Sequence, residues 1–229
     1  MNSYRTEDGY FQIKFLMEHA HDTFIVGFDN IIKEVIENSS KHLSDLRNWI
    51  GYVDSWIVSL EHHHYTEEKI LFPFFQEHNI NIELELQQHE KLHKDLNKIK
   101  IFLTNCKKDI SFYDPEKLKN FLNEMEANLK THLEEEISHL DRSKLEPFVK
   151  SDEIKNIILK LDKEAKDADP FIIPIYMQTH TKPEYKYWAD MGHIMYHFIL
   201  PLLSMKHYGY WKYAPYGITQ SHNNKRQKI

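Results

Sequence analysis

The chain has 229 residues, enough for one large domain or two small ones. Hydrophobic residues make up 41%, and with only 6 glycines and 8 prolines the composition is that of a globular, mostly helical protein. The net charge of −6 argues against nucleic acid or an anionic membrane as the main partner. A lone cysteine, Cys106, excludes an internal disulfide, and no apolar run is long enough for a signal peptide or a membrane span. We therefore expect a cytoplasmic protein.

The first predicted helix spans about residues 9–38. Its apolar stripe is spaced by three and four residues and consists of Ile13, Met17, His21, Phe24, Phe28, Ile31 and Val35. Because such a stripe lies on one face, His21 is predicted to point inward, whereas His19 belongs to another face. Gly27 would destabilise this helix by about 1 kcal/mol relative to alanine, which predicts a close packing contact at that position.

The second predicted helix follows residues 38–40, whose Asn-Ser-Ser sequence suits a turn and a helix N-cap. It ends near residues 74–78, where Pro73 favours a kink or a stop. Its apolar stripe is Trp49, Val53, Trp56, Leu60, Ile70 and Phe74.

The polar middle of this second helix carries potential metal ligands. The stripe, continued through it, reaches His63 and Glu67, which lie four residues apart. His62, His64 and Glu68 fall on the flanks, where we expect solvated or supporting roles.

Two further long helices repeat this pattern of ligand pairs. The third begins near residue 82, with the stripe Ile82, Leu86, His89, His93, Leu96, Ile99 and Leu103. Asp114 and Pro115 suit the N-cap and first position of the fourth. Its stripe is Leu118, Phe121 or Leu122, Met125, Leu129, His132, Glu136 and Leu140. Four amphipathic helices with short connections predict an all-α fold, an up-down-up-down four-helix bundle, over residues 1–145.

Residues 146–229 are predicted to form an appendage packed on the bundle, because the segment is too short to build a strong core of its own. We expect a fifth helix over about 151–167, an irregular stretch over 169–183, and an aromatic-rich sixth helix over about 184–205. The final ten residues, with the basic run 225–228, are expected to be disordered.

Seven potential metal ligands lie on the inward stripes. They are His21, His63, Glu67, His89, His93, His132 and Glu136. Burying a bare carboxylate in a core is unfavourable unless another group or a metal satisfies it. Five imidazoles and two carboxylates are too many for one ion and suit two, since imidazole binds iron, copper, zinc or nickel and a carboxylate can bridge. With a bridging oxygen, this set leaves one position open for a small ligand.

The motifs that carry these residues resemble, in order, those of the hemerythrin-like (HHE) cation-binding family. They are His21-Asp22, then His63-His64-Tyr65-Thr66-Glu67-Glu68 with Leu71-Phe72-Pro73, then Gln88-His89-Glu90-Lys91-Leu92-His93, then His132-Leu133-Glu134-Glu135-Glu136-Ile137. The resemblance covers about residues 10–145 and implies a four-helix bundle with a non-haem di-iron centre: two iron ions with an oxo or hydroxo bridge.

The resemblance also implies a role for each ligand. It implies that one iron is held by His89, His93 and His132. The other iron, at the position open to O2, would be held by His21 and His63, and both ions would be bridged by Glu67 and Glu136. The first helix also offers His19, and the fourth also offers Glu135. The resemblance assigns no role to residues 146–229.

Two other metal-site patterns occur in the same region. Residues 89–93 match the H-E-x-x-H string of zinc proteases, but both histidines are already used by the bundle and the chain has almost no strand signal. Glu61 to His64 and Glu136 to His139 match the E-x-x-H string of ferritin-like bundles, but Glu61, His64 and His139 lie off the stripes.

Three functions are consistent with the sequence. The first is a metal-binding protein that binds or senses O2 or another small diatomic molecule, or holds iron. The second is a di-iron oxidoreductase acting on peroxide, nitric oxide or a small substrate. The third is an interaction module in which the metal is a structural staple and the aromatic appendage contacts a partner protein.

Overall fold

The computed structural model describes residues 4–219, apart from the side chains of residues 39–43. Every regular element in that range is helical, so the predicted all-α class is confirmed. The first part contains η1 (Tyr4–Thr6), α1 (Gly9–Leu43), α2 (Leu46–Thr66), the π-helix η2 (Glu67–Leu71), α3 (Phe72–Glu77), α4 (Glu83–Lys108), η3 (Ile110–Phe112), α5 (Pro115–His139) and α6 (Arg142–Leu145). The C-terminal segment contains α7 (Ser151–Ala165), α8 (Ile173–His180), η4 (Pro183–Tyr185), the π-helix η5 (Met195–Ile199), α9 (Leu200–Ser204), η6 (Met205–His207) and α10 (Tyr208–Trp211).

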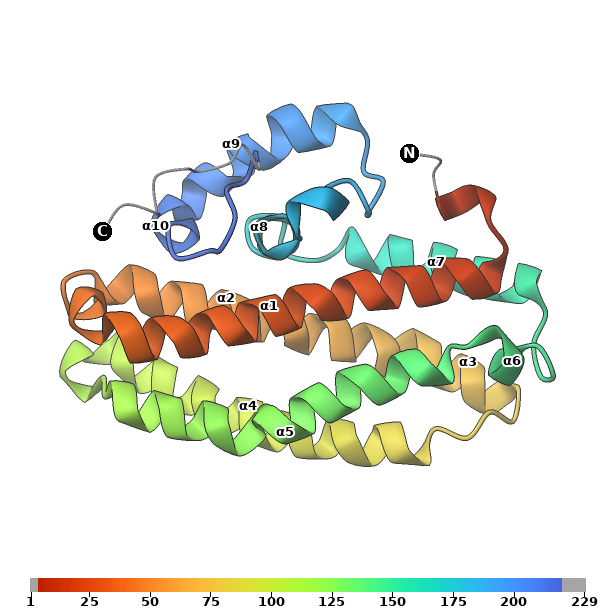
Figure 1. Cartoon of the computed structure of the whole chain (residues 1–229), viewed down its shortest axis with the longest axis horizontal. Coiled ribbons are helices and arrows are strands. Elements are labelled where there is room, and N and C mark those ends of the chain that lie inside the picture. Colours follow the sequence, from red (N-terminus) through yellow and green to blue (C-terminus); the bar gives the residue numbers. More distant parts are fainter. Residues whose placement is uncertain (1–3, 220–229) are drawn as a thin grey trace.

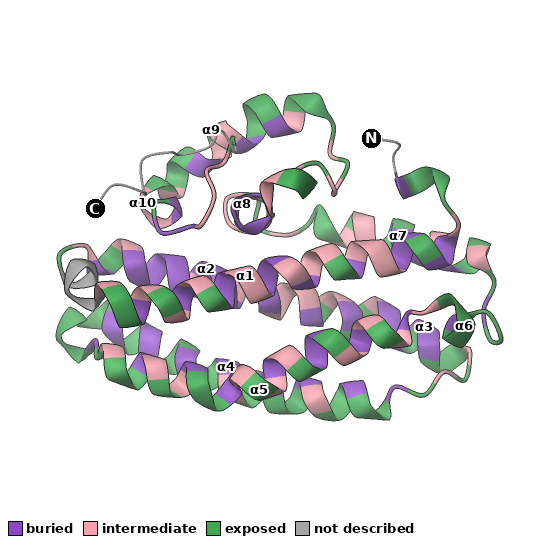
Figure 2. Cartoon of the chain, viewed as in Figure 1, coloured by how far each residue is buried: buried purple, intermediate pink, exposed green. Residues whose placement is uncertain are grey.

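Four long helical rods lie side by side along the long axis of the molecule (Figure 1). They are α1, α2 continued by η2 and α3, α4, and α5. Helices α1 and α4 each contact both α2 and α5, so the four rods enclose a common interior. Figure 2 shows that buried residues follow the inward faces and exposed residues the outward faces.

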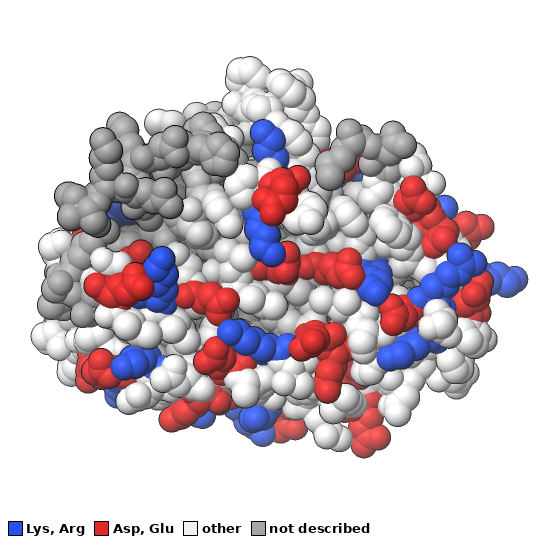
Figure 3. Space-filling model, in the orientation of Figure 1, with Lys and Arg blue, Asp and Glu red and all other residues white. Residues whose placement is uncertain are grey.

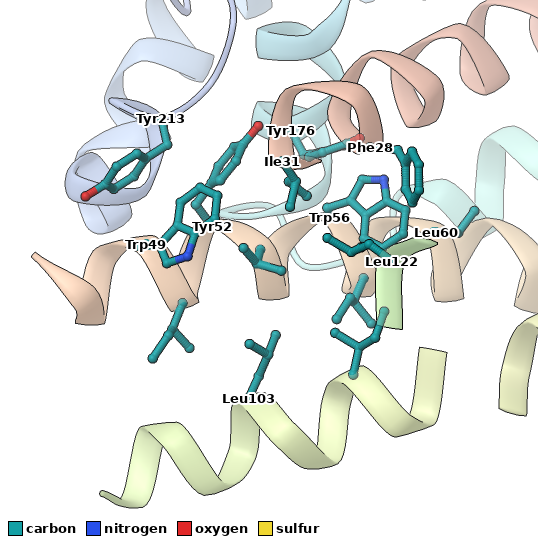
Figure 4. Packing of buried hydrophobic residues seen from close by; sticks show 14 of the residues in the cluster. Phe28, Ile31, Trp49, Tyr52, Trp56, Leu60, Leu103, Leu122, Tyr176 and Tyr213 are labelled. Carbon is teal, nitrogen blue, oxygen red and sulfur yellow. The ribbon is translucent and has the colours of Figure 1, made fainter. Parts of the chain in front are cut away.

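The interior is filled by two apolar clusters. The larger includes Trp49, Trp56 and Leu103, and the Trp56 ring lies beside Phe28 of α1 (Figure 4). The smaller lies around Leu71 and Phe75. On α1, α2 and α5 the residues of the two clusters are separated in sequence by the histidines and glutamates singled out above. The polar groups therefore form a layer between two dry cores.

The boundary between the first two helices differs from the prediction. Asn38 has non-helical backbone angles, φ −129° and ψ 21°, but helix α1 continues past this kink to Leu43. Helix α2 begins at Leu46, after Asp45. The break predicted at residue 38 is therefore present as a kink between two helical stretches, but the second long helix begins at Leu46 and not directly after residues 38–40.

The start of α5 follows the prediction. The side chain of Asp114 accepts hydrogen bonds from the backbone N–H groups of Glu116 and Lys117, and Pro115 occupies the first helical position. This N-cap satisfies donors that would otherwise lack partners at the helix start.

The buried face of α4 is rotated from the predicted one. Leu86 and His93 were predicted to point inward, but Leu86 is exposed and the side chain of His93 is 40% exposed. Glu85 and Leu92 are buried instead, on a regular face with His89 and four apolar residues: Leu96, Ile99, Phe102 and Leu103. This face was not recognised in the sequence because it contains the acidic residue Glu85. The Glu85 side chain is buried because its carboxylate contacts the imidazole of His139.

The C-terminal segment lies over α1 and α2, on the side away from α4 and α5 (Figure 1). The stretch 169–183 was predicted to be irregular, but it contains α8, which contacts both α1 and α2. The sixth helix was predicted from residue 184, but turns occupy the chain up to Asp190 and the helix begins at His193. The tail expected to be disordered, including 225–228, lies outside the described residues.

Gly27 has the close contact that the sequence predicted. A Cβ at this position would lie 2.2 Å from the hydroxyl oxygen of Tyr176 on α8 and 2.8 Å from Cδ1 of Trp56. The Tyr176 hydroxyl donates a hydrogen bond to the carbonyl of Thr23 on α1 at 2.8 Å. The missing side chain therefore lets α8 pack directly on α1.

A buried hydrogen-bond network also ties the C-terminal segment to the long helices. His180 Nδ1 donates to the Tyr176 carbonyl at 2.8 Å, so its Nε2 accepts from the Tyr52 hydroxyl, also at 2.8 Å. The amide of Asn30 donates to the Tyr52 hydroxyl at 2.8 Å and to the Tyr213 carbonyl at 2.9 Å.

On the face shown in Figure 3, lysine and arginine alternate with aspartate and glutamate, without a continuous basic area. Within residues 4–219, no helix combines the length and the apolar character needed to cross a membrane.

Candidate metal centre

Four of the predicted ligands form one buried cluster: His21, His63, Glu67 and Glu136. The Nε2 atoms of His21 and His63 are 3.0 Å apart, and Oε1 of Glu67 is 2.9 Å from His63 Nε2. Oε2 of Glu136 lies 3.4 Å from His21 Nε2. Helices α1, α2, η2 and α5 thus direct four donor atoms to one point.

Three imidazoles form a second buried cluster: His64, His89 and His132. The ring centroids of His64 and His89 are 4.3 Å apart, and those of His89 and His132 are 4.8 Å apart. All three side chains are buried. Their nitrogens come from α2, α4 and α5.

The two buried carboxylates lie between the clusters. Glu67 directs Oε1 to His63 in the first cluster and places Oε2 3.6 Å from His89 Nε2 in the second. Oε2 of Glu136 is 3.4 Å from His21 Nε2 and 3.7 Å from His132 Nε2. Each carboxylate can therefore reach two ions, one in each cluster.

The buried polar atoms at the centre lack hydrogen bonds. Both carboxylate oxygens of Glu67 and of Glu136, both ring nitrogens of His64, and Nε2 of His89 and of His132 have no hydrogen-bond partner among the described residues. Imidazole nitrogens lie within ion-pair distance of three of the four oxygens. Leaving so many buried groups unsatisfied is strongly unfavourable in a metal-free core. Nitrogen and carboxylate donors of this kind fit transition-metal ions such as iron.

In three of the histidines, His21, His89 and His132, the other ring nitrogen is held by a hydrogen bond. His21 Nδ1 is 2.7 Å from the Leu133 carbonyl, which fixes that nitrogen as the donor. His89 Nδ1 is 2.8 Å from Glu68 Oε1, and His132 Nδ1 is 3.2 Å from the Gln88 side-chain oxygen. These contacts orient the rings and leave Nε2 with a free lone pair toward the centre, as in metal sites generally.

Burial favours the neutral form of four of the imidazoles at the centre. Burial lowers the pKa of His63 and His64 well below the usual 6.5, and lowers the pKa of His132 to about 4. Burial also lowers the pKa of His89, although the neighbouring Glu68 opposes this effect. Neutral imidazole is the form that binds metal, so the site does not need to release protons from these rings at neutral pH.

The pKa values of the Glu67 and Glu136 carboxyl groups are shifted in opposite directions. Burial and the adjacent Glu136 carboxylate raise the pKa of Glu67 well above its usual range. Burial alone would raise the pKa of Glu136 too, but any positive charge on the adjacent His21 and His132 imidazoles opposes burial and lowers this pKa. Two like charges in one dry site explain this split, and a cation between them would favour the charged form of both.

The structure brings six of the seven predicted ligands into the two buried clusters and leaves His93 at the edge. His93 Nε2 is 2.7 Å from Glu68 Oε1, and the same oxygen contacts His89. Glu68, His89 and His93 form a third, partly exposed group of potential ligands. Whether His93 itself binds a metal stays a prediction.

His64 is the residue that sequence reasoning missed. It was expected on a solvated flank, but its side chain is buried. The sequence does contain a signal, because Ile50, Ile57, His64 and Leu71 recur every seven residues and all four are buried. Helix α2 is covered both by the other long helices and by the C-terminal segment, so its buried face is wider than one stripe.

The alternatives left open by the sequence are separated by position. His19 packs against Phe15 and Trp188 and not against the two clusters. Glu135 is half-buried and accepts a hydrogen bond from the Gln88 amide at 2.6 Å, so it supports His132 through Gln88.

The H-E-x-x-H string and the first E-x-x-H string each have a glutamate that lies outside the two buried clusters. Glu90 of the H-E-x-x-H string is exposed and pairs with Lys94, away from both clusters. Glu61 of the ferritin-like string pairs with Lys100 at the surface.

The helical fold and the donor set define a cation-binding protein of the histidine–carboxylate class. Its family follows from sequence comparison: the hemerythrin family, described as the Hemerythrin HHE cation binding domain, matches residues 13–140, more than half of the chain. The chain belongs to this family, which confirms the resemblance seen in its motifs. The comparisons with curated proteins and with solved structures found no match.

Proposed function

We propose that this protein binds two non-haem iron ions and uses them to bind or sense O2 or another small diatomic molecule. The observation that carries the proposal is the pair of adjoining clusters with Glu67 and Glu136 between them. His21 and His63 would hold one ion and His64, His89 and His132 the other. This set again has five imidazoles and two carboxylates, with His64 in the place that the family resemblance gave to His93.

The surroundings of the clusters support a binding role. The Phe24 ring lies against His63 with centroids 5.0 Å apart, and the Phe72 ring lies against His89 at 4.8 Å. Such apolar walls limit access of water to the ligands and favour reversible binding over activation. Bound iron would supply the electron exchange that binding of O2 requires.

The finer description of the fold belongs to the same proposal. We infer that the four long helices form the up-down-up-down bundle of the family over residues 1–145, with residues 146–229 as an appendage. A cytoplasmic location, expected from the lone Cys106, stays a prediction, as does partner binding through the appendage.

The test is metal content combined with an optical spectrum. Full-length protein is loaded with ferrous iron without oxygen, freed of excess metal, and then exposed to air. We expect two irons per chain and near-ultraviolet bands that bleach on reduction and return with O2. Retention of zinc alone, or of no metal, would contradict the proposal.

An oxidoreductase is the second candidate. It is favoured by a large cavity that reaches His63 and Glu67. Bands that return only slowly, or not at all, after reduction and re-exposure to O2 would support this alternative.

A further inference from the structure

A cavity of about 660 Å³ lies between the long helices and the C-terminal segment. One wall comes from α1 and α2, and the opposite wall comes from α7, α8, η5 and α9. Cavities that bind small organic molecules have volumes of about 300–1,000 Å³. About half of this wall lies beyond residue 140, where the family match ends, so the cavity is a feature of this chain and not of the shared domain alone.

The walls of the cavity are apolar. Leucine, isoleucine and methionine side chains predominate, among them Met17 on one side and Leu203 on the other. The hydroxyls of Ser59 and Thr66, which also line it, donate to the carbonyls of Ser55 and His63 in their own helix. Their hydrogens are therefore already used and are not available as donors to a ligand. Covering apolar surface of this extent with an apolar molecule removes it from water, which is favourable.

The charged groups that line the cavity away from the candidate metal centre balance one another. The Arg5 guanidinium lies 2.9 Å from Asp162 and 3.6 Å from Asp190, and all three residues line the cavity. Lys166 contributes a second positive charge, so two cations face two carboxylates there. A neutral molecule fits this part of the wall better than an anion or a cation does.

One end of the cavity reaches the candidate metal centre. His63 and Glu67 both line it. The His63 side chain is 13% exposed, more than any other member of the two buried clusters, whose side chains are otherwise nearly inaccessible. The accessible side of the centre therefore faces this apolar space.

From these observations, we propose that the cavity binds a neutral, largely apolar organic molecule of lipid-like size, with one end beside His63 and Glu67. The binding of the molecule depends only on the cavity. Its position next to metal rests on the proposed di-iron function.

The experiment uses full-length protein in metal-free and iron-loaded forms. The fluorescent probe 1-aminoanthracene, which is neutral and apolar, is titrated in and then displaced with 1-decanol or with decanoate. We expect saturable binding of one probe per chain in both forms, and displacement by decanol at lower concentration than by decanoate. No saturable binding to the folded wild-type protein, or tighter binding of decanoate, would overturn the proposal.

Two neighbouring leucines on α9 provide a matched pair of variants. Leu203 lines the cavity, whereas Leu202 is 67% exposed and does not. Leu203→Trp places a larger side chain in the cavity and should weaken probe binding at least tenfold, while Leu202→Trp should bind like the wild type. Equal affinity in the two variants would contradict the assignment. Ala20→Phe, from the α1 wall, gives the same test if Leu203→Trp does not fold.

Iron loading separates this inference from the proposed function. We expect iron to quench the fluorescence of the bound probe, because the probe would lie beside His63 and Glu67. Equal emission with and without bound iron would contradict that placement. A protein that binds the probe but no iron would retain the cavity site and lose the metal centre. One that binds iron but no probe would retain the metal centre and lose the cavity site.

Discussion

At the scale of single residues, the centre depends on atoms that have no other partner. Each oxygen of Glu67 faces an imidazole of a different cluster, His63 on one side and His89 on the other. Neither oxygen is hydrogen-bonded within the described part of the chain. Under the proposed function, a carboxylate placed in this way would bridge the two ions and couple the occupancy of both positions.

Glu67→Gln should therefore lose both metal ions together. The amide keeps the shape of the side chain but removes the negative charge that two cations would share. Metal per chain, measured by mass spectrometry after iron loading, should fall from two to below one. Glu61→Gln, at a surface position of the same helix that pairs with Lys100, is the matched control and should keep both ions. Similar metal loss in the two variants would contradict the bridging role.

The two histidines whose positions differ from the prediction can be tested against each other. His64 is buried in the second cluster, and His93 is partly exposed at its edge. We expect His64→Ala to lose at least one ion per chain and His93→Ala to retain both with weakened affinity, since the Nε2 of His93 is already hydrogen-bonded to Glu68 at the edge of the centre. Circular dichroism checks that each variant folds. Greater metal loss from His93→Ala would restore His93 as the ligand.

At the scale of elements, the π-helix η2 adjusts the register of the second helix. Pro73 has no N–H to donate, and the N–H of Phe72 bonds to the carbonyl of Glu67 five residues earlier. The wider turn takes in one extra residue, so Leu71 rather than the predicted Ile70 is fully buried. The π-helix η5 likewise ends two residues before Pro201. In η2 this irregular turn begins at Glu67, one of the proposed ligands.

The contact between α1 and α8 predicts the effect of adding one methyl group. Gly27→Ala gains about 1 kcal/mol of helix propensity, but its Cβ would overlap the Tyr176 hydroxyl and Trp56, and overpacking of this kind costs about 1–3 kcal/mol. We expect a net loss of up to about 2 kcal/mol in the free energy of unfolding, measured with urea.

Removal of the nearest atom provides the control. Tyr176→Phe deletes the hydroxyl oxygen and leaves the next ring atom, Cζ, 3.2 Å from the added Cβ. The Gly27→Ala substitution should therefore be less destabilising in the Tyr176→Phe background than alone. An equal loss in both backgrounds would show that α8 does not approach α1 as described.

At the scale of the whole molecule, the free energy of unfolding should depend on pH through His180, which links α8 in the C-terminal segment to Tyr52 of α2. Burial lowers the pKa of His180 from 6.5 to about 3. Below pH 6.5 the unfolded chain takes up a proton that the folded chain refuses until pH is near 3. The free energy of unfolding should therefore fall, as pH decreases through this window, by about 1.4 kcal/mol per pH unit from this group.

His180→Gln removes this titration and keeps a side chain that can hydrogen-bond to Tyr52. Urea unfolding of metal-free protein across the window should show a shallower pH dependence for the variant, by one proton per molecule. Parallel curves for wild type and variant would contradict the depressed pKa.

The sequence by itself determined the helical class, the family and most of the donor set, because helical periodicity depends only on local spacing. His21, His63, Glu67, His89, His132 and Glu136 lie four apart or on continuous apolar stripes, so their faces can be inferred without a neighbour. Asp114 and Gly27 carried similarly local signals, one for a helix start and one for a close contact.

Tertiary structure decided the rest, because burial depends on what packs against each face. His64 is buried by helices that come from distant parts of the chain. His93 lies at the edge of the centre because the buried face of α4 contains Glu85, His89 and Leu92 and not the predicted Leu86 and His93. The sequence of residues 169–183 did not predict helix α8, because this short helix is stabilised by its packing on α1 and α2. The cavity beside His63 arises only where the C-terminal segment meets the long helices. Local spacing specifies which groups can face inward, and long-range packing selects which of them do.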